Sequence, residues 1–137
     1  MATNRTREAS RLVSKNNLYV TSSDNIGVGT TVASTKLQVA GNVTAIDFNS
    51  TSDIRKKENI TDLTNALDVV GQLRGVSFNW VEDQTPSIGV IAQELQEVLP
   101  ELVHGDDTLT VNYNGIIGVL IEAVKELKAE VAELKQS

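Results

Sequence analysis

The chain has 137 residues, of which 40% are hydrophobic and 4% aromatic, and its formal net charge is −6. The sequence contains no cysteine and one histidine, which excludes disulfides, thiol catalysis and multi-histidine metal sites, so we expect no cofactor and no metal. An acidic chain lacks the basic face that phosphate groups require, so we expect no nucleic acid partner. No window approaches about 18 consecutive apolar residues, so we expect no membrane insertion.

The charge is divided unevenly along the chain. Residues 1–51 carry five Lys and Arg against three Asp and Glu, a net of +2, whereas residues 52–137 carry seven against fifteen, a net of −8. Residues 1–17 are polar and without period, which is typical of a flexible arm or of an arm that a partner orders. We therefore predict three parts: this arm, a β-rich segment over 18–51, and a separate domain over 52–137.

Short strand-like runs follow the arm. They are "LYV", "NIGVG" and "TKLQVAGNVTAIDF", with Gly41-Asn42 as a turn signal and Gly27-Val28-Gly29 predicted as a tight β-turn. The runs are too few and too poor in apolar residues to close a monomeric sandwich. We expect such segments to bury their apolar faces against copies of themselves.

The first part of the domain alternates between helical and strand-like patterns. The stretch "TDLTNALDVVGQLRG" has apolar residues at helical spacing, so it predicts a helix that Thr61 or Asp62 caps and that Gly75 ends in the left-handed conformation. "VSFNW" and "SIGVIA" predict two strands, and "QELQEVL" predicts a short helix that Pro100 stops. "ELV" and "LTVNY", joined by the turn "HGDD", predict a hairpin.

A long helix over about 115–135 is the clearest prediction in the sequence. Its apolar residues recur at spacings of 3, 4, 3, 4 and 3, a heptad pattern that is typical of a coiled coil. Glu126 and four other charged residues flank this row. The row, which we call the seam, is Ile117, Leu120, Val124, Leu127, Val131 and Leu134.

The stretch "STSDIRKKENI" at 50–60 permits two interpretations. In the first, the hydroxyl of Ser52 is a nucleophile and Lys57, five residues later, is the base that takes its proton, as in serine–lysine dyads. In the second, Ser52 or Asp53 caps a turn and the cations at 55–57 form a solvated face. The spacing by itself favours the second interpretation.

Four further motifs point to a known family. The runs "SDIRKKENI", "ALDVVGQLRGVSFNW", "IGVIAQELQEVLPELV" and "LTVNYNGIIGVLIEAVKEL" occur in this order between Ser52 and the end of the chain. Together they resemble the intramolecular chaperone of endosialidase family, the self-cleaving C-terminal domain of bacteriophage tail spikes and tail fibres, which also occurs in a membrane-anchored myelin transcription factor. The upstream "NIGVGTTVASTKLQVAGNVTA" is similar to β segments that precede this domain in phage fibres.

The resemblance implies both a fold and an activity. The implied fold is α+β: a trimeric β-rich fibre segment, then a small α+β chaperone domain that ends in a coiled-coil helix, in an intertwined parallel homotrimer. The implied activity is self-cleavage of the Thr51–Ser52 bond, with Ser52 as nucleophile, Lys57 as its partner and Asp53 as an acidic neighbour in the catalytic group.

The resemblance also implies a biological setting. We expect a component of the virion tail that takes part in host attachment and is assembled in the bacterial cytoplasm. Its N-terminal arm would bind other tail or baseplate proteins. The alternative is a structural trimerisation cap that is not cleaved and stays on the fibre.

Overall fold

The structure is a computed structural model that describes residues 17–136. The arm predicted over 1–17 lies outside the described residues, apart from Asn17. The chain divides into two compact units, Met1–Lys56 and Lys57–Ser137, and each is described below by itself.

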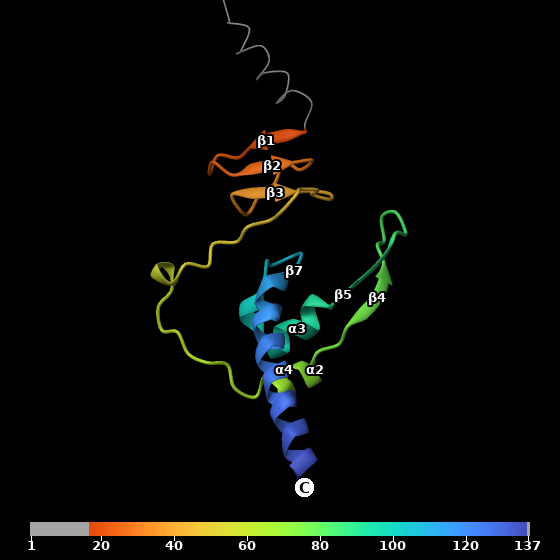
Figure 1. The fold of residues 1–137 in the computed structure, drawn as a ribbon. Helices are drawn as coiled ribbons and strands as arrows, with labels where there is room; N and C mark the ends of the chain where they lie inside the picture. Colours follow the sequence, from red (N-terminus) through yellow and green to blue (C-terminus); the bar gives the residue numbers. More distant parts are fainter. Residues whose placement is uncertain (1–16, 137) are drawn as a thin grey trace, which may run out of the picture. The chain divides into compact units, whose positions relative to one another are not determined.

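The first unit contains one small three-stranded sheet (Figure 1), built from β1 (Leu18–Val20), β2 (Ile26–Val28) and β3 (Leu37–Val39). The strand order is β1-β2-β3, with β1 antiparallel and β3 parallel to β2. The predicted strands are therefore present, but the third is shorter than the run that predicted it.

The turn predicted over Gly27-Val28-Gly29 is wrong for its first two residues, which lie within β2. The backbone leaves the strand at Gly29, whose φ of 69° is readily available only to glycine. The reason is the sheet itself, because Gly27 and Val28 pair with both neighbouring strands and so stay extended.

The first unit buries very little apolar surface. Among its described residues, Ala33 is the only hydrophobic side chain that is buried. The large apolar side chains that remain exposed are Tyr19, Val20, Ile26, Val32, Leu37, Val43, Ile46, Phe48 and Ile54. No helix or strand is found over 40–53, and a 3₁₀ turn, η1 (Ile54–Lys56), closes the unit.

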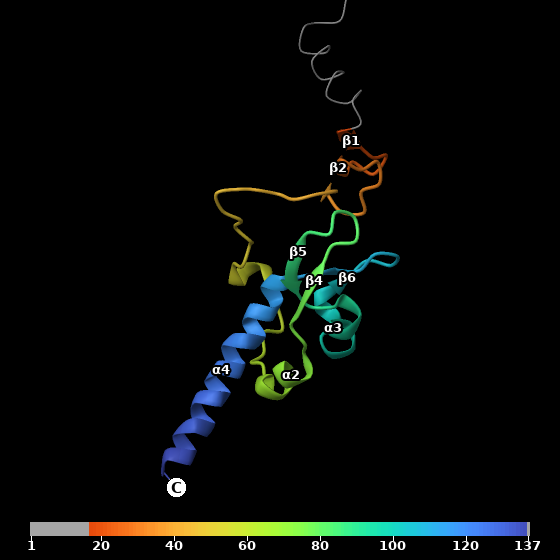
Figure 2. The ribbon, with the colours of Figure 1, turned by 90° about the vertical axis from the view of Figure 1, so that its right-hand side faces the viewer.

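The second unit has the predicted mixture of helices and hairpins (Figures 1 and 2). The strands β4 (Val76–Asn79) and β5 (Pro86–Gly89) form one antiparallel hairpin, and β6 (Val103–His104) and β7 (Thr110–Val111) form another. The helical elements are α2 (Ala66–Gln72), α3 (Ala92–Val98), the 3₁₀ turn η2 (Pro100–Leu102) and α4 (Tyr113–Gln136).

The core of this unit lies between α2, α3 and one face of α4. Its buried side chains are Ala66, Leu95, Leu99, Val103, Val119 and Ala123. The small side chains of Ala66 and Ala123 leave room for α2 and α4 to pack closely. Gly115 serves the same purpose near η2, because a Cβ at this position would lie 2.1 Å from a methyl carbon of Leu102.

The boundaries predicted for α2 are wrong at both ends. The helix begins after Asn65, which has a left-handed φ of 56°, and not at Thr61 or Asp62. It ends at Gln72, because Leu73 is extended, and Gly75 is not left-handed. The local cap signals failed because a carboxylate from a distant part of the chain accepts hydrogen bonds from the first helical N–H groups, as described below.

We predict that replacing Leu95 by alanine lowers the free energy of unfolding by about 2–5 kcal/mol, because a fully buried leucine leaves a cavity in a close-packed core. Leu95 is 1% exposed, whereas Gln96, the next residue of α3, is exposed and serves as the control. Urea denaturation of Leu95→Ala and Gln96→Ala measures both effects. Equal effects of the two substitutions would contradict the described core.

Candidate functional site

Residues 51–57 join the two units. Thr51 and Ser52 are exposed, as are the three cations that follow them at 55–57. The units divide between Lys56 and Lys57, so Ser52 precedes the last turn of the first unit and Lys57 begins the second unit. The predicted nucleophile and base therefore stand on either side of η1 in the sequence.

Asp53 organises the turn that separates them. Its carboxylate Oδ1 accepts the backbone N–H of Arg55 at 2.9 Å, and its carbonyl accepts the N–H of Lys56 at 3.0 Å. The Arg55 side chain folds back onto the same carboxylate, with Nη2 at 2.6 Å from Oδ2 and Nε at 3.0 Å from Oδ1. Asp53 thus caps this turn, as the second interpretation of the sequence predicted.

The electrostatics follow from this contact. The side chain of Arg55 and, secondarily, its backbone N–H hold the pKa of the Asp53 carboxyl below its ordinary value. The same pair raises the pKa of Arg55. A guanidinium that is always protonated cannot act as a base, so Arg55 is excluded from that role.

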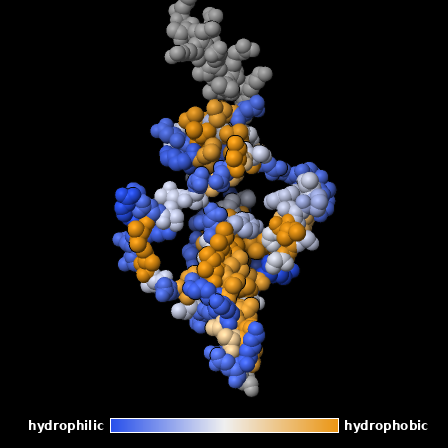
Figure 3. Space-filling view, viewed as in Figure 1, coloured by the Kyte–Doolittle hydropathy of each residue, from blue (hydrophilic) through white to orange (hydrophobic). Residues whose placement is uncertain are grey.

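The seam residues lie on the exposed face of α4. Their exposed fractions are 55% for Ile117, 43% for Leu120, 64% for Val124, 47% for Leu127, 42% for Val131 and 75% for Leu134. Val119 and Ala123, on another face of the helix, are buried in the core. Figure 3 shows hydrophobic residues gathered over this helix. The unit therefore uses one face of α4 for its own core and leaves the seam uncovered.

Glu126, which the heptad pattern places beside the seam, also contacts the first turn of α2. Its two carboxylate oxygens accept the N–H groups of Ala66 at 3.0 Å and of Leu67 at 2.8 Å. These two bonds, that of Leu67 first, hold the pKa of Glu126 below its ordinary value. The contact joins residues 60 positions apart, so no local pattern could have revealed it.

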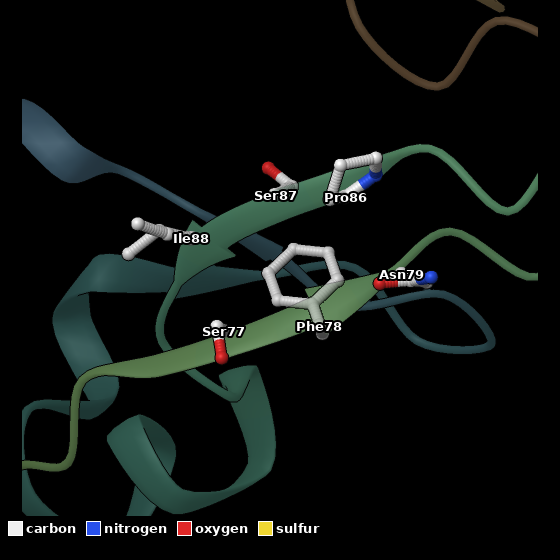
Figure 4. A pocket seen from close by; sticks show the side chains of 6 residues that line it. All are labelled: Ser77, Phe78, Asn79, Pro86, Ser87 and Ile88. Carbon is white, nitrogen blue, oxygen red and sulfur yellow. The ribbon is translucent and has the colours of Figure 1, made fainter.

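The β4–β5 hairpin carries an open depression with a volume of about 630 Å³ (Figure 4). Its lining residues are Ser77, Phe78, Asn79, Pro86, Ser87 and Ile88. None of them is an acid, a base or a cation. The Phe78 ring meets Trp80 edge to face, with ring centres 5.1 Å apart. The depression is therefore lined by apolar and uncharged polar side chains and offers no acid–base group.

The described residues offer neither a metal site nor a membrane span. Over residues 17–136 no group of three or more acidic or histidine side chains is placed to hold a metal ion. Within the same residues, no helix combines the length and apolar character that crossing a bilayer requires.

Comparison with known proteins gives one family and several relatives. Residues 52–104 match the model of a family that is named as a peptidase and described as "Chaperone of endosialidase". The match begins at Ser52, the first residue after the predicted cleavage point.

The chain is also similar to long tail fibre proteins. It is 40% identical over 105 residues to "Long tail fiber protein Gp37" of Enterobacteria phage K3 and, equally, of phage T2; the match covers 69% of this chain and 8% of each relative. Similarity to "Myelin regulatory factor homolog 1" of Caenorhabditis elegans is 32% over 124 residues, covering 80% of this chain and 13% of that protein. The chain thus spans a small fraction of the length of these relatives.

We predict that the stabilising effect of Glu126 depends on pH. Because its pKa is lowered in the folded protein, its contribution is fully present above the ordinary value of 4.5 and is lost as the pH falls through the lowered value. Glu126→Gln should therefore lower the melting temperature near neutral pH, and the difference from the unsubstituted chain should narrow in acid.

The control is Glu133→Gln, because Glu133 is exposed and lies one heptad further along the same helix. Its melting temperature should follow that of the unsubstituted chain at every pH. A difference between Glu126→Gln and the unsubstituted chain that stays constant from neutral to acidic pH would show that the carboxylate charge is not what stabilises α2.

Proposed function

Because the resemblance to the chaperone-of-endosialidase family is confirmed over residues 52–104, we propose that this is a phage tail fibre or spike protein that assembles as a parallel homotrimer. Its C-terminal domain would drive trimerisation and folding of the upstream β segment, and would then release itself by cleaving Thr51–Ser52. This proposal has three parts: the homotrimer, the cleavage and the catalytic residues. The uncovered seam supports the assembly, and the resemblance supports the number of chains, the cleavage and the catalytic residues.

The uncovered seam is the observation that supports assembly into a trimer. Six large apolar side chains lie in heptad register along α4, and all of them are more than 40% exposed. Burying one such side chain completely contributes about 1.5–3 kcal/mol, so a row of six favours association strongly. Its mixture of Ile, Leu and Val does not fix the number of helices, so the number three rests on the resemblance.

The charges beside the seam favour parallel helices. With Ile117 at the first heptad position, Glu130 and Lys135 fall at the g position and at the e position of the next heptad. These two positions face each other between neighbouring helices of a parallel coiled coil, where opposite charges attract. A parallel assembly would therefore place Glu130 of one chain beside Lys135 of the next.

The composition of the first unit explains why a clamp would be needed. The large apolar side chains of its three strands are exposed or half-buried, and none of them is buried. Strands with such a small apolar face specify their register weakly, and non-local strand pairing is slow. A trimeric clamp on the C-terminal side would raise the local concentration of the three strands and align them. Removing the clamp afterwards would make reopening slow, which is kinetic stability.

The proposed cleavage starts at Ser52. Its Oγ attacks the carbonyl carbon of Thr51 while Lys57 Nζ takes the hydroxyl proton, and the Thr51–Ser52 peptide bond breaks as its nitrogen is protonated. The resulting ester joins the Thr51 acyl group to Ser52 Oγ. Water hydrolyses this ester to a Thr51 carboxylate and a free Ser52 hydroxyl. Backbone N–H groups would stabilise the oxyanion that forms in each step.

Lys57 is the base we assign, because the resemblance places the base five residues after the serine. Lys56 lies in η1 and Arg55 is paired with Asp53. A lysine amine accepts a proton only when it is neutral, and desolvation favours the neutral form. Covering this segment in the trimer would supply that desolvation, so assembly would have to precede cleavage.

The similarity to long tail fibre proteins supports a location in the virion tail. Assembly in the host bacterial cytoplasm and a role in host attachment are part of the proposal. Residues 1–17 would contact other tail or baseplate proteins. The second candidate function is a trimeric cap that remains uncleaved on the fibre, which the uncovered seam supports equally well.

We predict that Leu127→Asp prevents trimerisation, because an unpaired charge in the buried seam costs several kcal/mol, on the order of 2–5 per site. Native mass spectrometry should give three copies for the unsubstituted chain and one for the variant. Ala129→Asp, which adds the same charge on an exposed position of α4, is the control and should remain trimeric. A monomeric unsubstituted chain at micromolar concentration would refute the assembly.

The same variant tests the order of events. If trimerisation builds the catalytic site, Leu127→Asp should stay uncut as well as unassembled, while Ala129→Asp is cut. The measurement is the intact mass of each purified chain. An efficiently cut Leu127→Asp monomer would show that one chain suffices for catalysis.

The catalytic assignment predicts a ranking of four variants. Ser52→Ala should abolish cleavage without affecting the trimer, and Lys57→Ala should do nearly the same. Lys56→Ala should have a much smaller effect, and Ser52→Cys should keep some activity because a thiolate is a competent nucleophile.

Gel electrophoresis and mass spectrometry after equal expression measure this ranking. A fragment of Ser52→Ala that still begins at residue 52 would refute the nucleophile, and a block seen only with Lys56→Ala would move the base by one residue. An unsubstituted trimer that remains intact would instead favour the uncleaved cap.

A further inference from the structure

The turn between Ser52 and Lys57 is held by a direct contact between the Asp53 carboxylate and the Arg55 guanidinium. Both carboxylate oxygens of Asp53 contact the Arg55 guanidinium, at 2.6 and 3.0 Å, and Oδ1 also accepts the Arg55 backbone N–H. We infer that Asp53 and Arg55 form a clamp that positions the nucleophile, and that Asp53 is a positioning residue instead of a proton-transfer group. This inference rests on the proposed self-cleavage.

The geometry disfavours a role for Asp53 as a base. A general base needs a lone pair directed at the proton that it takes, and a pKa near the working pH. Three donors from Arg55 already approach the two oxygens of Asp53, and they hold its pKa below the ordinary value. The carboxylate is thus a poor proton acceptor that faces its own turn.

The same contacts give the clamp a positioning role. The i→i+3 hydrogen bond from Lys56 N–H to the Asp53 carbonyl makes residues 53–56 a 3₁₀ turn. Such a turn advances about 2.0 Å per residue, against about 3.3–3.6 Å for an extended chain, so it shortens the path between residues 52 and 57. A spacing of five residues allows Ser52 and Lys57 to meet only if the chain bends between them, and this turn is such a bend.

Arginine is suited to this contact for a geometric reason. Its planar guanidinium binds both carboxylate oxygens at once, which lysine cannot do. The Arg55 side chain is 85% exposed and that of Asp53 38%, so the pair adds little to overall stability. The pair instead selects one conformation of residues 53–56, so its removal should lower the cleavage rate.

The first test compares cleavage rates in the full-length trimer. Asp53→Ala and Arg55→Ala should each slow cleavage by about 10- to 100-fold, the cost typical of a misplaced reacting group. The double variant Asp53→Ala/Arg55→Ala should be no slower than the slower single variant, because the two residues act as one unit. Lys56→Ala is the control, since it removes a neighbouring cation and leaves the clamp intact.

Asp53→Asn separates the two roles of the carboxylate. Asparagine keeps an oxygen that accepts the Arg55 N–H and loses the ability to accept a proton. A positioning residue therefore predicts less than about a tenfold loss of rate and an unchanged midpoint of the pH–rate profile. If Asp53→Asn is cut as slowly as Asp53→Ala, and its pH–rate profile loses the acidic limb, the inference is overturned and Asp53 is a base.

The second test does not require cleavage. In the Ser52→Ala trimer, amide hydrogen exchange at Arg55 and Lys56 reports directly on the turn. Adding Asp53→Ala should speed exchange at both amides by about tenfold or more, the change expected when a local hydrogen bond opens, while Lys56→Ala should leave Arg55 protected. Unchanged exchange with Asp53→Ala would overturn the clamp.

The two tests keep this inference separate from the proposed function. If the unsubstituted trimer is not cut at Thr51–Ser52, both the self-cleavage and the positioning role are refuted. This holds even if hydrogen exchange shows that the turn is formed. If it is cut, and Asp53→Ala and Arg55→Ala are cut as fast as Lys56→Ala, the clamp alone is refuted and the self-cleavage stands.

Discussion

The contact between Glu126 and the start of α2 is the constraint on which the C-terminal unit depends. A helix of seven residues is too short to be stable alone, and its first N–H groups need acceptors. The Glu126 carboxylate satisfies two of them and fixes α2 along α4, with Ala66 and Ala123 buried nearby. α3 and the turn η2 then complete the core. Without this contact, the unit would lose the helix that covers the inner face of α4.

The contacts that α4 makes within its own unit decide which of its faces stays exposed for association with other chains. Once Val119, Ala123 and Glu126 are engaged with the rest of the unit, the seam is the face that remains uncovered. One helix thus serves both a monomeric core and, in the function we propose, a trimeric coiled coil. The β4–β5 hairpin and the sheet of the first unit also expose large apolar side chains, and small isolated sheets are only marginally stable. An assembly of several chains would bury the exposed apolar side chains of the seam, of the β4–β5 hairpin and of the first unit's sheet.

Both interpretations of residues 52–57, a capped turn and a catalytic dyad, are compatible with the structure. Asp53 does cap a turn, as the structural interpretation held. That turn lies between the residues of the proposed dyad, so a cap and a catalytic segment are compatible in the same six residues. A turn that is stable before cleavage reduces the conformational entropy that the reaction would otherwise lose in bringing its groups together.

The sequence by itself determined the elements whose signals are local. The heptad spacing predicted α4, the alternation in "VSFNW" predicted β4, and Pro100 correctly marked the end of α3, because each depends on residues close together in the chain. The motifs that begin at Ser52 also predicted the family whose model matches residues 52–104. Ser52, Lys57 and the seam as an interface remain predictions.

The tertiary structure decided the boundaries and partners that no local pattern encodes. α2 starts at Ala66 because Glu126, 60 residues away, replaces the cap that Thr61 or Asp62 would have provided. Gly27 and Val28 stay in a strand because two neighbouring strands pair with them. Which face of α4 is buried was decided in the same way, by packing against a helix that is distant in sequence. The physical reason is common to all three: short-range propensities are weak, and hydrogen bonds and packing between distant segments override them.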